Sequence, residues 1–182
     1  MLLLHCCFVV FKGYTAGSHR LHPGSGSNYL CVPNDPQWEN YLSGAQNSGT
    51  VVGVAYGFSS RSYNIFSENN TETDLGGSPA PCAVCYVGGR STILMIPART
   101  QCPDGWTTEY KGYLMSEYSD TERKRSSFIC WDQAPEIGVG IKASSQTMSW
   151  QAAIYPVEVV CGTLPCSKYI TNRELTCVVC SK

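Results

Sequence analysis

The sequence contains an internal repeat, and this repeat constrains the possible folds more than any other feature. Residues 11–31, FKGYTAGSHRLHPGSGSNYLC, and residues 110–130, YKGYLMSEYSDTERKRSSFIC, have the same length and align without a gap. Both begin with an aromatic residue followed by Lys-Gly-Tyr, and both end with an aromatic residue, an aliphatic residue and a cysteine. Repetition at a fixed offset indicates that one folding unit occurs twice.

A second match places the ends of the two units. The motif PCAVCY at residues 81–86 corresponds to TCVVCS at residues 176–181. The offset is 99 residues for the first match and 95 for the second, as expected if loops differ in length between copies. We therefore predict two tandem homologous subdomains, residues 1–86 and residues 99–182, joined by a connecting segment at residues 87–98.

Strand-type patterns dominate both predicted subdomains. β-Branched and aromatic residues occur in short runs bounded by Gly, Pro, Asn and Ser, which is typical of β-strands. No window shows a helical apolar stripe, and 17 Gly and 10 Pro residues interrupt the chain. We expect a mostly β fold of two disulfide-stapled subdomains with long irregular loops. The predicted strands lie at residues 50–56, 91–96, 127–131 and 148–160, the last with a break at Pro156.

In each copy of the repeated motif a tyrosine follows a glycine. Glycine is frequent in tight turns because it adopts backbone conformations that other residues avoid. We therefore expect Tyr14 and Tyr113 to lie in tight turns, each with a half-buried ring and a hydroxyl group at the surface.

The chain has eleven cysteines among 182 residues. Cytosolic proteins keep their thiols reduced, whereas secreted proteins use many cysteines for disulfides. The sequon Asn69-Asn70-Thr71 fits the same environment and makes Asn69 a candidate glycosylation site. We predict a secreted chain with a disulfide framework and no membrane span, since no stretch beyond the apolar start approaches the roughly 20 apolar residues that cross a bilayer.

The second predicted subdomain has six cysteines, which allow fifteen connectivities. Cys161 and Cys166 flank the turn sequence GTLP, so a local disulfide between them is plausible on geometry. The cysteines of the motif at residues 177–180 would then reach back to Cys130 and Cys102. In the chain-entropy model, a disulfide that closes about 48 residues from Cys130 contributes about 4 kcal/mol, and the short local disulfide contributes about 2 kcal/mol.

The first predicted subdomain repeats this scheme incompletely. Cys31 can pair with Cys82, but Cys85 then needs a partner near the start of the chain. Cys6 and Cys7 are the candidates for that partner. One of them can form a disulfide with Cys85, and the other would remain as an odd thiol.

Two alternatives to a disulfide framework are disfavoured. The two Cys-x-x-Cys motifs could supply four thiolates to zinc, but zinc ribbons separate such pairs by about 15–20 residues. Here 91 residues intervene. Thiol–disulfide exchange at CAVC would need a low-pKa thiolate at a helix start, and no helical pattern follows either motif. We expect no metal site.

Charge and residue content disfavour two functional classes. The net charge of −1 and the scattered Lys and Arg residues lack the electrostatic footprint of a nucleic-acid-binding protein. All three histidines lie within residues 5–22, and no nucleophile–His–acid spacing is visible. The carboxylates of Asp104, Glu109 and Glu117 are expected to lie at the surface. We predict no catalytic residues, no cofactor and no nucleic-acid partner.

The segment that joins the two predicted subdomains has a distinctive sequence. Residues 81–115, PCAVCYVGGRSTILMIPARTQCPDGWTTEYKGYLM, combine a Cys-Ala-Val-Cys motif with a Cys-Pro-x-Gly-Trp motif and a following Gly-aromatic pair. This junction resembles the one between the tandem subdomains of the type IV collagen C-terminal non-collagenous domain. Closer still is the resemblance to the terminal domain of invertebrate short-chain (spongin-type) collagens, through SNYLCVPNDPQW, PCAVCYV, CPDGWTTEYKGYLMSEY and ELTCVVCSK. It covers nearly the whole chain from Phe11.

The resemblance implies a location, a function and a disulfide pattern. In those collagens the domain selects chains, nucleates trimers and joins trimers end to end in the extracellular matrix. It therefore implies an extracellular matrix protein that self-associates as a trimer or higher oligomer, or that binds other matrix proteins. The nested disulfides of that family imply the pairs Cys102–Cys180, Cys130–Cys177 and Cys31–Cys82.

Two features depart from the collagen pattern. The 182 residues contain no Gly-X-Y tract, so this chain cannot itself form a collagen triple helix. The Cys-Pro-x-Gly motif that opens the second copy is absent from the first, where MLLLHCCFVV stands instead. We expect a first subdomain that is truncated or mis-started at its N-terminus.

A secreted recognition module, for example a lectin-like protein that binds a glycan, is the alternative function, because tyrosine-rich, disulfide-stapled β units often bind sugars or proteins. The two copies differ most at residues 19–26 (HRLHPGSG) and residues 120–125 (DTERKR), here named the first and second divergent loops. We expect these two loops to determine any partner specificity.

Overall fold

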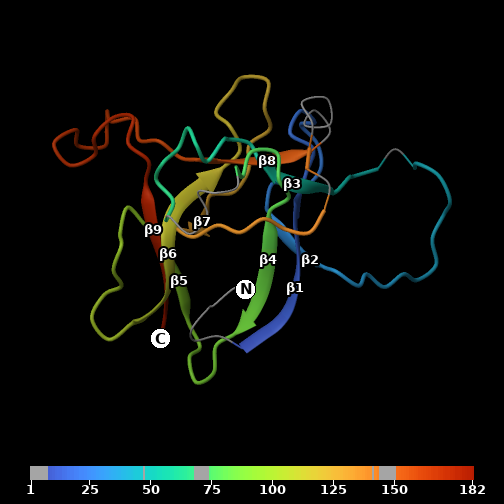
Figure 1. Cartoon of the computed structure of the whole chain (residues 1–182), viewed down its shortest axis with the longest axis horizontal. Coiled ribbons are helices and arrows are strands. Elements are labelled where there is room, and N and C mark those ends of the chain that lie inside the picture. Colours follow the sequence, from blue (N-terminus) through green and yellow to red (C-terminus); the bar gives the residue numbers. More distant parts are fainter. Residues whose placement is uncertain (1–7, 47, 68–73, 141, 144–150) are drawn as a thin grey trace.

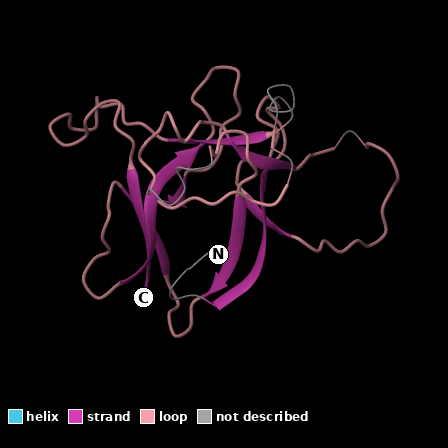
Figure 2. Ribbon diagram, viewed as in Figure 1, coloured by secondary structure: helices cyan, strands magenta, loops and turns pink. Residues whose placement is uncertain are grey.

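The computed structural model describes residues 8–46, 48–67, 74–140, 142–143 and 151–182. This part of the chain contains nine β-strands and no helix, so the predicted mostly β class is confirmed (Figure 2). It therefore has no helix long and apolar enough to cross a membrane. The strands are β1 (Phe8–Gly17), β2 (Leu30–Pro33), β3 (Val52–Tyr56), β4 (Pro81–Tyr86), β5 (Ile93–Pro97), β6 (Thr107–Ser116), β7 (Ile129–Asp132), β8 (Ala152–Pro156) and β9 (Thr176–Ser181).

The four strands predicted from sequence correspond to β3, β5, β7 and β8. The first three begin two residues later than predicted and end within one residue of the predicted end. Strand β8 ends at Pro156, where a break was predicted, because proline has no amide hydrogen to donate to a strand ladder. The predicted start of this strand, residues 148–150, lies outside the described residues.

The strands form two groups with the same pairing pattern. In the first group β1 pairs antiparallel with β2 and β4, and in the second β6 pairs antiparallel with β7 and β9. Corresponding residues oppose each other in both groups: Gly13 faces Cys82, and Gly112 faces Cys177. The pairing also shifts by one residue at equivalent places, after Val9 in β1 and after Thr108 in β6. Such a bulge bends a strand and increases its twist.

The repeated glycines lie within the long strands, so the prediction of tight turns was wrong. A Cβ atom on Gly13 would lie 1.8 Å from the carbonyl oxygen of Val32, and one on Gly112 would lie 1.8 Å from that of Trp131. No other residue leaves room for neighbouring backbones to approach this closely. The glycine of the repeated motif is therefore required by the contact between β1 and β2, and between β6 and β7.

The two tyrosines of the motif occupy different environments. Tyr14 is exposed, whereas Tyr113 is partly buried and its hydroxyl donates a hydrogen bond to the carbonyl of Ile65 (2.8 Å). The expected half-buried ring with a surface hydroxyl therefore describes neither side chain.

One mixed sheet connects the two groups. Strand β3 pairs in parallel with β8, so that Val54 opposes Ala152 and Tyr56 opposes Ile154. Figure 1 shows the first group beside the second, with β3 and β8 crossing between them. Strand β5, from the predicted connecting segment, pairs antiparallel with β9 and adds a strand to the second group.

The main hydrophobic core lies where the two groups meet. Its buried side chains come from both halves of the chain, mainly from the connecting strands β3 and β8 and the loops beside them, and Tyr56, Met115 and Ile154 are completely buried. The ring of Tyr56 packs edge-on against Trp131 at 5.8 Å between centroids. Burial of each such side chain contributes about 1.5–3 kcal/mol. Neither half of the chain therefore forms this core alone. The buried residues are Val54, Tyr56, Phe58, Phe66, Leu75, Ala80, Met115, Ala152 and Ile154.

Candidate functional site

Disulfides fasten the two groups at matching positions. Cys31–Cys82 joins β2 to β4, and Cys130–Cys177 joins β7 to β9, each with 5.7 Å between the Cα atoms. Cys102–Cys180 ties the segment before β6 to β9. These three pairs are the ones that the resemblance implies. The fourth, Cys161–Cys166, is the local pair favoured by spacing.

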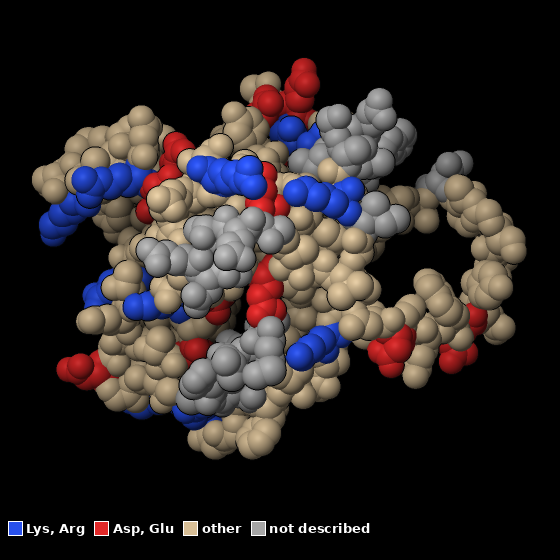
Figure 3. Space-filling view, in the orientation of Figure 1, with Lys and Arg blue, Asp and Glu red and all other residues tan. Residues whose placement is uncertain are grey.

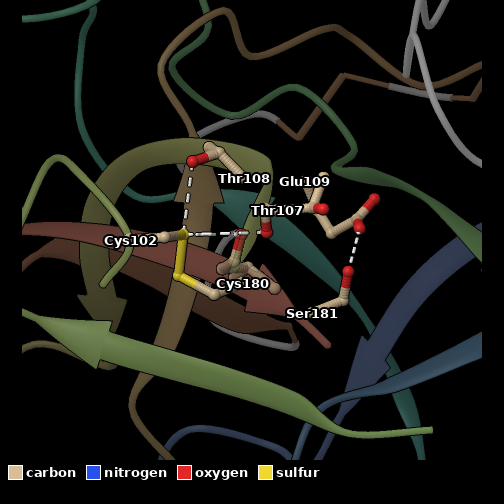
Figure 4. The surroundings of a disulfide bond; sticks show 7 residues. Cys102, Thr107, Thr108, Glu109, Cys180 and Ser181 are labelled. Carbon is tan, nitrogen blue, oxygen red and sulfur yellow. Dashed lines mark hydrogen bonds between the residues drawn. A yellow bond between two sulfur atoms is a disulfide. The ribbon is translucent and has the colours of Figure 1, made fainter. Parts of the chain in front are cut away.

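Hydrogen bonds surround the Cys102–Cys180 disulfide (Figure 4). The hydroxyl of Thr108 donates to the Sγ atom of Cys102 at 3.2 Å, and Cys180 is completely buried. The next residue, Glu109, accepts a hydrogen bond from Ser181 and pairs with Arg90 at 3.2 Å. The Glu109 side chain is only 9% exposed, so the prediction of a surface carboxylate was wrong at this position. The ion pair fastens the connecting segment to β6.

The remaining predicted site residues fall into two sets. Cys85 is disulfide-bonded as well, so all four cysteines of the two Cys-x-x-Cys motifs are in disulfides. The candidates for its partner, Cys6 and Cys7, lie outside the described residues, as does Asn69. Among the residues that the structure describes, no three His, Cys, Asp or Glu side chains are grouped so that they could hold a metal ion. Asp104 is exposed, as expected.

The two divergent loops lie against each other, although they are 100 residues apart in sequence. The amide of Lys124 donates to the carbonyl of Arg20 (2.7 Å), and its side-chain amine donates to the carbonyl of Gly24 (2.7 Å). Next to the loops, the amide of Ser127 donates to the carbonyl of Ser27 (2.9 Å). The segments predicted to determine specificity therefore form one surface.

Buried polar groups support this surface from below. The carboxylate of Glu117 accepts hydrogen bonds from the amide of Ala153 (3.1 Å) and from Arg123 (3.2 Å), and its side chain is 6% exposed. Burial raises the pKa of this carboxyl, and the prediction of a surface position was wrong. The hydroxyl of Tyr29 lies 3.1 Å from both the Ser126 hydroxyl and the Ala153 carbonyl. Burial also raises the Tyr29 pKa. Both the Glu117 carboxylate and the Tyr29 hydroxyl thus help to hold the two loops together.

A further repeat appears in the backbone hydrogen bonds that border the core. Residues 54–56 bond with residues 77–80, here named the first edge, and residues 157–159 bond in the same pattern with residues 172–175, the second edge. The matching amide-to-carbonyl bonds are Ala80 to Val54, Tyr56 to Ser78 and Gly77 to Tyr56 in the first edge, and Leu175 to Val157, Val159 to Arg173 and Asn172 to Val159 in the second.

The second strand group covers the first edge. The segment between β7 and the second edge, residues 133–156, is named the second arm. The second arm contains β8, which pairs with β3. It also contains Gly138, whose amide donates a hydrogen bond to the carbonyl of Pro79 (2.8 Å). The amide of Ala143 likewise donates to the carbonyl of Gly77 (2.7 Å). The second arm thus completes the first edge by adding backbone hydrogen bonds along it.

The second edge is open in the described part of the chain. Asn172 and Glu174 are equivalent to Gly77 and Pro79, yet no described residue donates a hydrogen bond to either carbonyl. The neighbouring Val160 is 75% exposed. The second edge therefore presents the same backbone pattern as the first without its cover.

Within the residues that the structure describes, the first arm, residues 34–51, forms no backbone hydrogen bonds of the kind that the second arm makes, although its Thr50 carbonyl accepts a hydrogen bond from the Ser25 hydroxyl (2.8 Å). It leaves the sheet as a wide loop (Figure 1), and every described residue in it is exposed. Three large apolar side chains lie on it: Trp38 is 79% exposed, and Tyr41 and Leu42 are each 77% exposed. Its only charged residues are acidic (Figure 3). Contiguous exposed apolar surface often marks an interaction site, whereas single exposed apolar side chains are common.

A second contact between the groups is also made by only one of two equivalent loops. The loop after β3, residues 57–67, packs on the second group, where Phe66 meets the Tyr113 ring at 5.5 Å and the Ser67 amide donates to the Gln133 carbonyl (2.9 Å). The equivalent face of the first group includes Tyr14 and is exposed. The equivalent loop of the second group, residues 160–171, exposes Leu164 and Ile170.

No family model matches the sequence, and no solved structure matches the fold.

Proposed function

We propose that this chain is an extracellular matrix protein that works by self-association, through a contact between molecules that repeats the contact inside one molecule. The observation that carries the proposal is the pairing of an exposed first arm with an open second edge. The disulfides are consistent with a secreted protein. Association through surfaces, rather than catalysis, would be its activity.

The proposal includes an organisation in two copies of one unit, residues 1–86 and residues 99–182, joined by residues 87–98. Matching strand registers, matching bulges and matching disulfides support it. The matching hydrogen bonds of the two edges support it further. If the copies are equivalent, a contact that one copy makes is also available to the other.

This equivalence gives a specific register for the contact. Inside the chain, Ala152 opposes Val54 in a parallel pair. Val157 is equivalent to Val54, an offset of 103 residues, and the same offset makes Gly49 equivalent to Ala152. We therefore propose that three residues beginning at Gly49 pair in parallel with three residues beginning at Val157 of a second molecule. These hydrogen bonds would extend the second edge as β8 extends the first.

Apolar burial would supply most of the driving force. Full burial of a large apolar side chain contributes about 1.5–3 kcal/mol, so Trp38, Tyr41 and Leu42 would together contribute on the order of 6 kcal/mol. The loss of translational and rotational freedom opposes this gain. The exposed face around Tyr14 and the loop at residues 160–171 would add a second contact between the same two molecules.

The geometry of the contact determines the kind of assembly. Arm and edge are different surfaces, so each molecule would offer one arm and receive another. Such head-to-tail contacts form closed rings when the rotation closes and filaments when it does not. We propose a closed ring, and the resemblance to collagen terminal domains favours three chains. A ring of this kind would suit a module that joins matrix proteins.

Size-exclusion chromatography with light scattering on the secreted, oxidised protein tests the proposal. The wild-type chain should form an oligomer, and a variant with Trp38→Ser, Tyr41→Ser and Leu42→Ser should be a monomer that still unfolds cooperatively, at a melting temperature that no longer depends on protein concentration. Phe128→Ser is the matched control, because this side chain is 60% exposed outside the arm. A wild-type monomer that binds a glycan array would reject self-association and favour a lectin-like function.

A further inference from the structure

We propose that the Cys161–Cys166 disulfide, here named the loop disulfide, is a site of reductive thiol–disulfide exchange that weakens self-association when it opens. This inference rests on the proposed function, since the loop borders the second edge. Cys161 follows the exposed Val160, and the loop returns to Asn172, whose amide donates to the carbonyl of Val159 (2.9 Å). A change in this loop therefore acts directly beside the proposed docking strand.

The equivalent loop of the first group, residues 57–67, is held by aromatic packing instead of a disulfide. At the offset of the two edges, Phe58 occupies the position of Cys161. Phe58 is buried, and its ring contacts Tyr63 at 5.5 Å and Phe66 at 5.4 Å between centroids. Aromatic packing thus fixes the first loop in the shape that meets Tyr113. In the first group, a loop held by aromatic packing accompanies the contact between the two groups.

The second loop is held differently. Its apolar side chains Leu164 and Ile170 are exposed, so packing contributes little to its shape. The loop disulfide closes it, together with a hydrogen bond from the amide of Cys161 to the hydroxyl of Thr171 (3.3 Å). That hydroxyl in turn lies 3.2 Å from the Sγ atom of Cys161. A covalent bond thus takes the place that aromatic packing has in the first loop.

Exposure and loop length favour reduction at this disulfide. Cys166 is exposed, whereas Cys177 and Cys180, each in another disulfide, are completely buried. The loop disulfide joins residues 5 apart, and the other three described pairs join residues 47, 51 and 78 apart. A short loop gains the least from the chain-entropy effect, and exposed disulfides are the most readily reduced.

The exchange is a two-electron reduction by a dithiol, either a small molecule or a protein of the thioredoxin class. A thiolate of the reductant attacks the Sγ atom of Cys166 and forms a mixed disulfide. The bond to Cys161 breaks, and Cys161 leaves as a thiolate that takes up a proton. The second thiol of the reductant then attacks the mixed disulfide, releases Cys166 as a thiol and leaves the reductant as a disulfide.

Opening the loop disulfide would weaken association through entropy. The loop would gain conformational freedom in the free chain and lose it again on docking. Because fixing even one or two residues costs about as much as a tenfold change in affinity, we expect self-association to weaken about tenfold or more. The core and the other disulfides, among them the three described long-range pairs, would stay intact, so the change would be reversible.

Graded dithiothreitol with differential alkylation and analytical ultracentrifugation tests the inference. Mass spectrometry should find Cys161 and Cys166 alkylated at lower dithiothreitol concentrations than any other described cysteine. At that stage the protein concentration at half-association should rise about tenfold. The variant with Cys161→Ser and Cys166→Ser should match the reduced chain and should not respond further to the same dithiothreitol.

Each contrary outcome has a distinct meaning. Earlier alkylation of another disulfide, or equal association of the oxidised and loop-reduced chains, overturns this inference and leaves the proposed function standing. An oxidised wild-type chain that stays monomeric at every concentration overturns the proposed function, and this inference falls with it. If the double serine variant fails to fold, the loop-reduced wild-type chain still decides between these outcomes.

Discussion

The glycine at the centre of β6 gives the sharpest test of the repeated sheet. A Cβ atom on Gly112 would lie 1.8 Å from the Trp131 carbonyl oxygen and 2.6 Å from the amide nitrogen of Gln133. Both atoms belong to the backbone, so a side chain cannot simply rotate away. The Cys130–Cys177 disulfide holds the strands on either side of β6. Gly112→Ala must therefore push β7 away from β6.

The expected cost follows from what that displacement breaks. Overpacking of a well-packed region costs about 1–3 kcal/mol, and a buried hydrogen-bonding group left without its partner costs about 1–3 kcal/mol more. We expect Gly112→Ala to lower the free energy of unfolding by on the order of 4 kcal/mol. Gly13→Ala should act in the same direction, since its Cβ would lie 1.8 Å from the Val32 carbonyl. Either loss is large beside the roughly 5–15 kcal/mol of a typical domain.

Urea unfolding without a reductant, so that the disulfides stay intact, measures this loss of unfolding free energy. Gly53→Ala is the matched control, because Gly53 also lies in a strand but a Cβ atom there would meet nothing within 4 Å. We expect that variant to change stability by no more than about 1 kcal/mol, with a gain possible because alanine restricts the unfolded chain. If Gly112→Ala unfolds within about 1 kcal/mol of Gly53→Ala, the close-approach explanation of the repeated glycine is refuted.

Replacing Cys102 and Cys180 together with alanine should lower the free energy of unfolding by about 4–5 kcal/mol, and removing the loop disulfide should lower it by about 2 kcal/mol. The first loss is larger because that disulfide closes a longer loop and so constrains the denatured chain more. The opposite ranking in urea unfolding would contradict this account. Tyr29→Phe should cost about 1–2 kcal/mol through the lost hydroxyl contacts, and an unchanged midpoint would contradict it. Burial, and secondarily a nearby carboxylate, raises the pKa of Tyr110 to about 12. This residue should therefore leave stability unaffected below pH 10 and lower it by up to about 1.4 kcal/mol per pH unit from there toward pH 12, in addition to the loss from other buried tyrosines such as Tyr29, whose pKa is also raised. Tyr110→Phe should make the alkaline slope shallower by about that amount, and an unchanged slope would exclude this residue as a contributor.

The strand class and the repeat were accessible from the sequence, because both are local signals. Runs of β-branched residues predicted β3, β5, β7 and β8, and the lack of an amide hydrogen in Pro156 predicted the end of β8. The Lys-Gly-Tyr motif was misinterpreted for a related reason. A glycine that permits a turn and a glycine that permits close strand approach look the same in one sequence, and only the backbone of Trp131 distinguishes them at Gly112.

The contacts between the two groups could not be predicted, because their partners are distant in sequence. Glu117 was expected at the surface, but its carboxylate is held by the amide of Ala153, 36 residues away. Spacing alone left the disulfide pattern open among fifteen possibilities. The parallel pairing of Val54 with Ala152 has no local signature at all. The open second edge became visible only through comparison with the covered first edge.

The parallel pairing of β3 with β8 also has a consequence for how the chain is made. Ribosomes deliver the chain from its N-terminus, so β3 emerges nearly a hundred residues before the strand that completes its core. Pairing over such sequence distances is slow, because loop closure costs entropy before any contact compensates for it. During that interval residues 54–56 can bond with residues 77–80, but the side of β3 that pairs with β8 stays open and prone to aggregation. We therefore expect the open side of β3 in the nascent first half to need protection until residue 156 has followed it.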